Sequence, residues 1–316
     1  MPPAGRILLL RPPAGLDPDL FPPDRTVAVT GFRPDHDALA AAGFAVADAP
    51  EGSFAAAFVS LPRAKALARD LVARAAGAVG DGGAVVVDGA KTDGVESLLR
   101  AVREVATVGE VVSKAHGKCF TATANAALRA WREAPTRVDG FLVPPGGFSA
   151  DGVDPGTAAL IDALPPLRGR VCDLGAGWGA LAAAILARSP EVAALDLVEA
   201  ERAALDCARA NVADPRAAFH WADATRWEAA PYDAVATNPP FHAGRVPDPA
   251  LGQAFVRAAA RLLAPSGRLF LVANRRLPYE AALEAAFAEV AVRAEGGGYK
   301  VIEAARPRRG GRRGQG

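Results

Sequence analysis

The sequence predicts an α/β fold with mostly parallel sheets, divided between two tandem domains. Three observations support this prediction: short apolar runs alternate with Ala- and Leu-rich stretches, the two halves share a similar segment, and 316 residues suffice for two domains of ordinary size. The chain is 51% hydrophobic and 22% charged, which is typical of globular proteins and excludes a disordered chain.

The alternation is clearest in the C-terminal half. We expect strands at residues 170–174, 192–199, 232–238 and 267–273, and helices at 180–189, 200–212 and 251–264. Strands that alternate with helices across short loops lie parallel to one another, because each helix carries the chain back to the same edge of the sheet. This half is therefore predicted to be a parallel sheet with helices on both faces.

The N-terminal half contains an echo of this pattern. Residues 71–91 align without gaps with residues 255–275, and both segments read as a helix, a turn closed by Gly83 or Gly267, an apolar strand and a basic residue. The segments "HGKCFTATA" and "GGYKVIEAA" follow at nearly the same offset. We interpret the halves as copies of one fold, although Ala-rich helices also match by chance. The first copy has no glycine-rich loop after the strand expected at 25–32 and no Asn-Pro-Pro segment. We therefore expect it to have the same fold but no catalytic residues.

A Pro- and Gly-rich stretch near residues 132–145 separates the copies. We expect a degenerate domain over 1–135, a catalytic domain over 136–306 and a disordered Arg/Gly tail over 307–316. The arginines of the tail have two interpretations, a flexible arm that grips phosphates or a disordered segment that adds solubility.

Charge and cysteine content restrict the partners. The net charge of +1 gives no overall field that attracts nucleic acid or a membrane, and the three cysteines lie far apart without a CxxC pair. We therefore expect neither disulfides nor a metal site. The N-terminal apolar run "ILLL" is too short for a signal peptide, and no run approaches the roughly 18 apolar residues of a membrane helix. A cytoplasmic protein is expected, monomeric in the simplest case.

The segment "DLGAGWG" at residues 173–179 lies between a predicted strand and a predicted helix. Gly175 and Gly177 allow a tight turn and the close approach of a ligand, and the helix that follows offers free N–H groups. Glu199, 20 residues past the last glycine, has the spacing of a carboxylate that binds ribose hydroxyls. Asp196 competes for this role, and we favour Glu199 because it lies nearer the expected strand end.

Asp173 argues against a dinucleotide, because a carboxylate directly before the turn would repel a pyrophosphate. It suits a cationic ligand such as a sulfonium with an amino-acid tail. A nicotinamide-dependent oxidoreductase is therefore a distant alternative. With these residues the loop resembles the first motif of the class I S-adenosylmethionine-dependent methyltransferases, which implies Rossmann-like methyltransferase domains and S-adenosylmethionine as cofactor.

The same resemblance implies roles for two further sites. Glu199 would take the ribose, and the segment "WADAT" at 221–225 matches the adenine-binding loop of these enzymes. In that loop Asp223 would lie near the exocyclic amine and the N–H of Ala224 would face the ring. An ordinary loop aspartate is the alternative for Asp223.

The segment "NPPFH" follows the strand predicted at 232–238. The two prolines stiffen the turn and leave carbonyls free as acceptors, and in the fold implied above this loop faces the methyl group. We expect the Asn238 side-chain oxygen and the Pro239 carbonyl to accept both N–H bonds of an exocyclic amine, and Phe241 to stack on the base. No strong base is needed; His242 either touches the substrate or merely packs.

The choice of amine rests on the segment "PGGFSADGVDPGT" at 145–157. Its Phe148, Ser149, Asp151, Asp154 and Gly156 resemble the Phe-Ser-x-Asp-x-x-Asp-x-Gly pattern of the bacterial ribosomal RNA guanine-N2 methyltransferases, both the methyltransferase C type that acts on the small subunit and its large-subunit relative G.

The resemblance is close over residues 140–306 and only one of layout over 1–131. It implies that Phe148 and Asp154 belong to a segment that closes over the cofactor, that the degenerate domain serves RNA recognition or folding, and that the substrate is ribosomal RNA or a ribosomal subunit, with 30S favoured. Methylation of adenine N6 or of a protein glutamine amide by the same motif is the nearest alternative, and a binding protein without activity is another.

Overall fold

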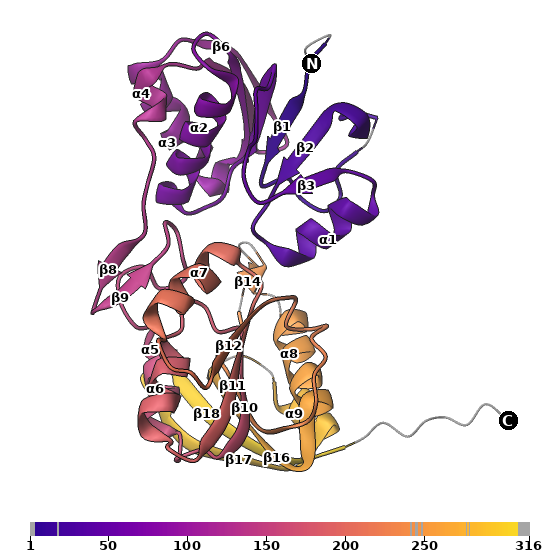
Figure 1. Cartoon of the computed structure of the whole chain (residues 1–316), viewed down its shortest axis with the longest axis vertical. Helices are drawn as coiled ribbons and strands as arrows, with labels where there is room; N and C mark the ends of the chain where they lie inside the picture. The colour runs from indigo at the N-terminus through magenta and orange to yellow at the C-terminus, as the bar shows by residue number, and fades with distance from the viewer. Residues whose placement is uncertain are drawn as a thin grey trace, which may run out of the picture. The chain divides into compact units, whose positions relative to one another are not determined.

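The structure, a computed structural model, describes residues 4–17, 19–240, 242–243, 246–247, 249–275, 277 and 279–308, with side chains for all of these except 242–249. It divides into two compact units, Met1–Thr136 with Pro144–Gly147 and Arg137–Val143 with Phe148–Gly316. Each unit is built on a seven-stranded sheet (Figure 1).

The sheet of the first unit has the strand order β3-β2-β1-β4-β5-β7-β6. Its strands are β1 (Ile7–Leu10), β2 (Thr26–Val29), β3 (Ala45–Ala47), β4 (Ala56–Ser60), β5 (Ala84–Ala90), β6 (Val108–Lys114) and β7 (Gly117–Thr123). The helices are α1 (Arg33–Ala41), α2 (Lys65–Val79), α3 (Val95–Val105) and α4 (Ala126–Arg129), with 3-10 turns η1 (Pro23–Arg25) and η2 (Lys91–Asp93). The strands β1–β5 are parallel to one another, whereas β7 pairs antiparallel with both β5 and β6.

The sheet of the second unit has the order β12-β11-β10-β13-β16-β18-β17. Its strands are β10 (Gly169–Leu174), β11 (Val192–Glu199), β12 (Ala217–Trp221), β13 (Tyr232–Thr237), β16 (Leu263–Asn274), β17 (Phe287–Gly296) and β18 (Tyr299–Pro307). The helices are α5 (Pro155–Ala163), α6 (Ala180–Arg188), α7 (Arg202–Asn211), α8 (Pro249–Leu262) and α9 (Glu280–Ala286). Two small hairpins are formed by β8 (Thr136–Val138) with β9 (Phe141–Val143) and by β14 (His242–Ala243) with β15 (Val246–Pro247).

The two sheets have the same topology, strand for strand, which confirms the predicted fold class of two tandem α/β domains with mostly parallel sheets. The repeated segments fall on α2–β5 and on α8–β16, and the second pair falls on β7 and β18. The shared turn glycine has a steric reason in both copies. An added Cβ would lie 2.7 Å from the Val79 side chain at Gly83 and 2.8 Å from the Tyr232 carbonyl oxygen at Gly267.

The first unit lacks both motifs at the positions that correspond to them in the second unit. The strand expected at 25–32 is β2, whereas the topology makes β1 the counterpart of β10, the strand before the glycine-rich loop. The segment after β1 reads "RPPAG", and among the described residues between β1 and β2 the structure has the 3-10 turn η1 where the second unit has the helix α6. After β4 the chain reads Leu61-Pro62 where the second unit has its Asn-Pro-Pro segment. The degenerate character of the first unit therefore holds at both positions.

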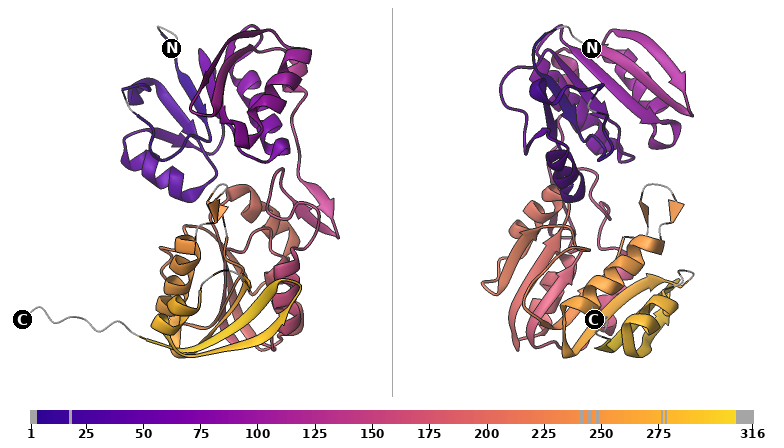
Figure 2. Two further views of the ribbon diagram at one scale, coloured as in Figure 1. Left: turned by 180° about the vertical axis from the view of Figure 1, so that it is seen from behind. Right: turned by 90° about the vertical axis from the view of Figure 1, so that its right-hand side faces the viewer.

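The second sheet is covered on both faces (Figures 1 and 2). Because successive strand residues point to opposite faces, Val171 packs with α5, α6 and α7, and Cys172 packs with α8 and α9. All five of the strands β10–β13 and β16 run parallel, so the loops after β10, β11, β12 and β13 lie at one edge. In open parallel sheets this edge is where ligands bind. No helix in the described part of the chain is long and apolar enough to cross a membrane.

Candidate active site

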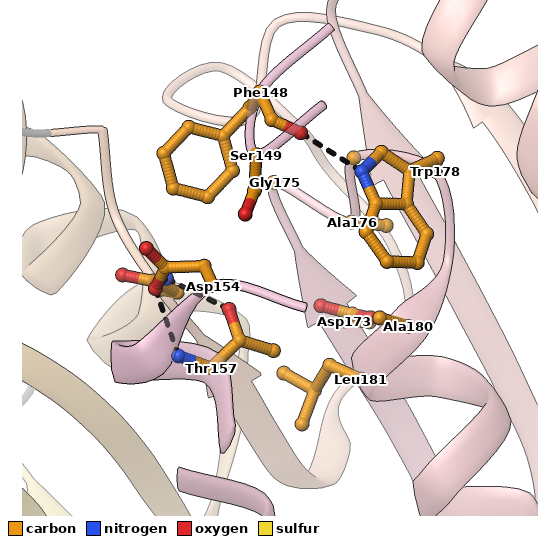
Figure 3. Close-up of a pocket in the computed structure, with 12 residues that line it drawn as sticks. Phe148, Ser149, Asp154, Thr157, Asp173, Gly175, Ala176, Trp178, Ala180 and Leu181 are labelled. Carbon is orange, nitrogen blue, oxygen red and sulfur yellow. Dashed lines mark hydrogen bonds between the residues drawn. The ribbon is translucent and has the colours of Figure 1, made fainter. Parts of the chain in front are cut away.

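A pocket opens at this edge of the second sheet, between the glycine-rich loop and the start of α5 (Figure 3). It is lined by Phe148, Ser149, Asp154, Thr157, Asp173, Gly175, Ala176, Gly177, Trp178, Ala180, Leu181 and Asn238. The structure therefore brings together the predicted residues of three separate motifs. Glu199, Asp223 and Ala224 are not among the lining residues; Glu199 is the last residue of β11, and Asp223 and Ala224 lie in the loop after the adjacent strand β12.

The glycine-rich loop is held in a conformation that needs glycine. Gly175 and Gly177 have φ of 81° and 56°, in the left-handed region that side chains avoid. The N–H groups of Gly175 and Ala176 both donate to the carbonyl of Val198, at 2.9 and 3.1 Å. The Trp178 indole N–H donates to the Phe148 carbonyl at 2.8 Å (Figure 3). This hydrogen bond connects the segment before α5 to the glycine-rich loop.

Glu199 lies at the end of β11 and braces this loop. Its Oε2 accepts the Gly177 N–H at 2.7 Å and its Oε1 accepts the Glu201 N–H at 2.8 Å. Its own carbonyl accepts the N–H of Ala222 at 3.1 Å, which links it to the loop after β12. Glu199 is thus fixed between the glycine-rich loop and the predicted adenine loop.

Asp196 has a different set of partners. Its carboxylate accepts hydrogen bonds from His220 Nε2 at 2.6 Å and from the Tyr232 hydroxyl at 2.8 Å. Burial by itself raises the pKa of Asp196, but these hydrogen bonds outweigh it and hold the pKa below its usual range. In a strand, residues 196 and 199 face opposite sides of the sheet, and Asp196 belongs to a side-chain network rather than to the pocket wall.

In the loop after β12, the Asp223 side chain stabilises the turn in which it lies. Its Oδ1 accepts the N–H of Thr225 at 2.8 Å and the hydroxyl of Thr225 at 2.7 Å. Ala224 is buried. These bonds fix the loop conformation and leave lone pairs of the Asp223 carboxylate available to a ligand.

Asp173 is the most strongly perturbed acid of the site. It is only 1% exposed, and its Oδ2 is buried without a hydrogen-bond partner among the described residues. Burial, with the nearby charge of Glu199 as second cause, raises the pKa of Asp173 to about 8. A buried carboxylate is costly to ionise without a partner, so this position favours a cationic ligand.

Asn238 is held at the end of β13. Its Nδ2 donates to Asp154 Oδ2 at 3.0 Å and to Thr157 Oγ1 at 2.8 Å, while its Oδ1 is buried and has no partner in the described part of the chain. The preceding Thr237 hydroxyl donates to the Leu174 carbonyl at 2.6 Å, which fastens the end of β13 to the end of β10. Pro239 is buried; Phe241 and the His242 side chain lie outside the described residues.

The segment before α5 forms the opposite wall. Asp154 caps α5, because its Oδ2 accepts the N–H of Thr157 at 2.9 Å. Phe148 is 60% exposed at the pocket, and the next residue, Ser149, has φ of 54° and donates its hydroxyl to the Gly152 carbonyl at 2.6 Å.

Sequence reasoning missed Thr157 and Trp178, which both line the pocket. The signal for Thr157 was the Asp-Pro pair before it: Asp154 followed by Pro155 predicts a helix start, which places Thr157 on the first turn beside the cap.

Comparisons with known proteins agree with this site. The family described as "Methyltransferase small domain" matches residues 140–303, the range that contains the pocket. A ribosomal RNA small subunit methyltransferase C from Hahella chejuensis is 33% identical over 96% of this chain and 95% of its own, and one from Chromohalobacter salexigens is 34% identical over 78% and 77%.

The chain belongs to the ribosomal RNA small subunit methyltransferase C family. A solved member of this family, the T. thermophilus 16S rRNA N2 G1207 methyltransferase (RsmC) in complex with AdoMet and guanosine, superposes with a TM-score of 0.82. It is 26% identical, and the match covers 97% of this chain and 89% of the T. thermophilus chain. The match extends through both units of the chain. The predicted family, fold class and methyltransferase activity are confirmed.

Proposed function

We propose that this chain transfers the methyl group of S-adenosylmethionine to the exocyclic N2 amine of a guanine in 16S ribosomal RNA. The observation that carries the proposal is the buried, unpartnered Oδ1 of Asn238 in the same pocket as the buried Oδ2 of Asp173, which likewise has no partner among the described residues. One atom is ready to accept a hydrogen bond from an amine, and the other is ready to meet a cation.

The residues of the pocket fit this cofactor. Asp173 would hold the cationic amino-acid end, and Gly177, where an added Cβ would have no atom within 4 Å, would leave room for it. Glu199 would take the ribose hydroxyls with its remaining lone pairs, and Asp223 and Ala224 would hold the adenine. Phe148 and Asp154 belong to the wall that closes the pocket. When bound, the cofactor supplies an electrophilic methyl group.

The chain's own contribution is to hold a weak nucleophile. The lone pair of an exocyclic amine is delocalised into its ring. Asn238 Oδ1 and the Pro239 carbonyl would accept its two N–H bonds, which directs the lone pair away from both acceptors and stabilises the positive charge that develops on nitrogen. Phe241 would stack on the base. The resulting ammonium loses its proton readily, so no side chain has to act as a strong base and no metal is required.

The relatives support the choice of substrate. Those named above are small-subunit enzymes, and the solved T. thermophilus enzyme holds guanosine. We propose the 30S subunit or its RNA as partner, a cytoplasmic location because ribosomes are assembled there, and a monomeric enzyme. The first unit, which lacks the glycine-rich loop and the Asn-Pro-Pro segment, would serve to recognise RNA or to assist the folding of the second unit.

The proposal is tested with purified protein and methyl-labelled S-adenosylmethionine. Undermodified 30S and 50S subunits, naked ribosomal RNA and total protein are offered separately, and the labelled product is digested and identified. We expect N2-methylguanosine in 16S rRNA. Label in N6-methyladenosine or in a protein glutamine would keep the Asn238 chemistry and overturn the substrate, and label in 23S rRNA would overturn the small-subunit assignment.

A further inference from the structure

The Asn238 side chain is clamped by two residues of one helix start. Its amide nitrogen donates to Asp154 Oδ2 and to Thr157 Oγ1, at 3.0 and 2.8 Å. Asp154 is the cap of α5 and Thr157 lies in its first turn, so a single element supplies both acceptors. The clamp uses both N–H bonds of the amide.

The chemistry of these partners fixes which way the amide points. An ionised carboxylate can only accept hydrogen bonds, so the amide nitrogen has to face Asp154. Rotating the amide by half a turn would place Asn238 Oδ1 against Asp154 Oδ2, two acceptors with no proton between them. The oxygen is therefore directed away from the helix start.

This orientation leaves the side-chain oxygen of Asn238 without a hydrogen bond in the described part of the chain. Asn238 Oδ1 is buried and has no partner among the described residues. A buried acceptor without a hydrogen-bond partner destabilises a protein, and this penalty is removed when a donor binds to it. The contact between the amide N–H and a charged carboxylate also polarises the amide and makes its oxygen a better acceptor.

We propose that Asp154 and Thr157 are positioning residues, which orient Asn238 so that its Oδ1 must accept a hydrogen bond from the nucleophile. The pocket then selects nucleophiles that carry an N–H bond and disfavours those that offer only lone pairs. This inference rests on the proposed function. It assigns Asp154 a second role, the orientation of the Asn238 side chain, besides its place in the wall that closes the pocket.

The surroundings of the clamp keep the carboxylate in place. Gly156 separates the two clamp residues, and a Cβ there would lie 2.9 Å from Asp154 Oδ2 and 2.8 Å from the ring of Tyr299. Any side chain at 156 would therefore push on the acceptor itself. Thr157 is 9% exposed, and Leu160 on the next turn is fully buried, which anchors α5 in the core.

Two matched pairs of variants separate the clamp from the helix. Thr157→Val keeps the shape of the side chain and removes the acceptor, whereas Thr157→Ser keeps the acceptor. Asp154→Ser keeps a good helix cap but is too short to reach Asn238, whereas Asp154→Asn can keep both the cap and one acceptor oxygen. We expect Thr157→Val and Asp154→Ser to lower kcat about ten-fold, on the scale of one lost hydrogen bond in a positioned group. The Ser variant at 157 and the Asn variant at 154 should recover most of that loss.

A second readout does not depend on catalysis. The side-chain amide protons of Asn238, assigned by their disappearance in Asn238→Ala, should exchange slowly with solvent in the wild type and faster in Thr157→Val and Asp154→Ser. If the wild type makes no N2-methylguanosine, the proposed function fails, and the exchange rates still decide the clamp. Equal exchange rates in all variants, or equal losses of kcat in both members of a pair, would overturn the inference.

Discussion

Cofactor binding should depend on pH through Asp173. Without cofactor, burial and the charge of Glu199 raise the pKa of this carboxyl to about 8, against an ordinary value of 3.8. A cationic ligand needs the ionised form. With such a pKa, about 1 in 100 molecules carries the carboxylate at pH 6 and about 1 in 10 at pH 7. The affinity for S-adenosylmethionine should therefore rise about ten-fold between these pH values, and each binding event should release close to one proton.

The range from pH 6 to pH 7 lies below the pKa of the ligand's own amino group, roughly 7.7–8.0 for an α-amine, so the ligand stays cationic throughout. Titration calorimetry at one pH in two buffers of different ionisation enthalpy counts the released protons directly. Asp173→Asn is the matched control: it keeps the shape, cannot ionise, and should bind more weakly with an affinity that does not change between pH 6 and pH 7. A wild-type affinity that is equally flat, with no proton released, would refute the assignment of Asp173 to the cationic end of the cofactor.

Three further predictions concern stability, turnover and RNA binding. Since the pKa of Asp173 is raised in the folded protein, its contribution to stability is present at acidic pH and is lost as the pH rises towards about 8; Asp173→Asn should therefore raise the thermal midpoint of the cofactor-free protein at pH 8 more than at pH 5, and equal shifts at both would contradict this. Asn238→Ala should lower kcat by about 10²-fold or more and leave the cofactor Kd nearly unchanged by calorimetry, whereas retained turnover would remove the proposed mechanism. Deleting residues 309–316, which lie beyond β18 and Arg308, removes three arginines and should lower the log–log salt slope of RNA binding by up to roughly 2 units if they bind phosphates, at about 0.7 per single-strand contact; an unchanged slope would indicate a segment that only adds solubility.

The fold could be predicted from the sequence where hydrophobic pattern and chain order suffice. The strands β10, β11 and β13 lie where the apolar runs indicate, and the echo between 71–91 and 255–275 reflects two sheets of identical topology. The correspondence of β1 with β10 could not be predicted from the sequence, because β1 has only four residues and no α-helix stands between it and β2 in the described part of the chain.

The site was only partly accessible to the same reasoning. Asp173 and Asn238 each sit next to a sequence signal, the glycine-rich loop and the proline pair. The bond between Asp154 and Asn238 spans 84 residues and depends on how α5 packs against the sheet, which no local pattern records. The spacing along the chain does not show that Asp196 and Glu199, on opposite sides of β11, have different hydrogen-bond partners; the structure does.

The most direct test of the account uses 16S rRNA from cells that lack this gene. Nuclease digestion and mass spectrometry locate each N2-methylguanosine before and after complementation with the wild type or with Asn238→Ala. We predict that one N2-methylguanosine is lost in the deletion strain, returns with the wild type and does not return with Asn238→Ala. An unchanged set of N2-methylguanosines in the deletion strain, or full restoration by Asn238→Ala, would contradict the account.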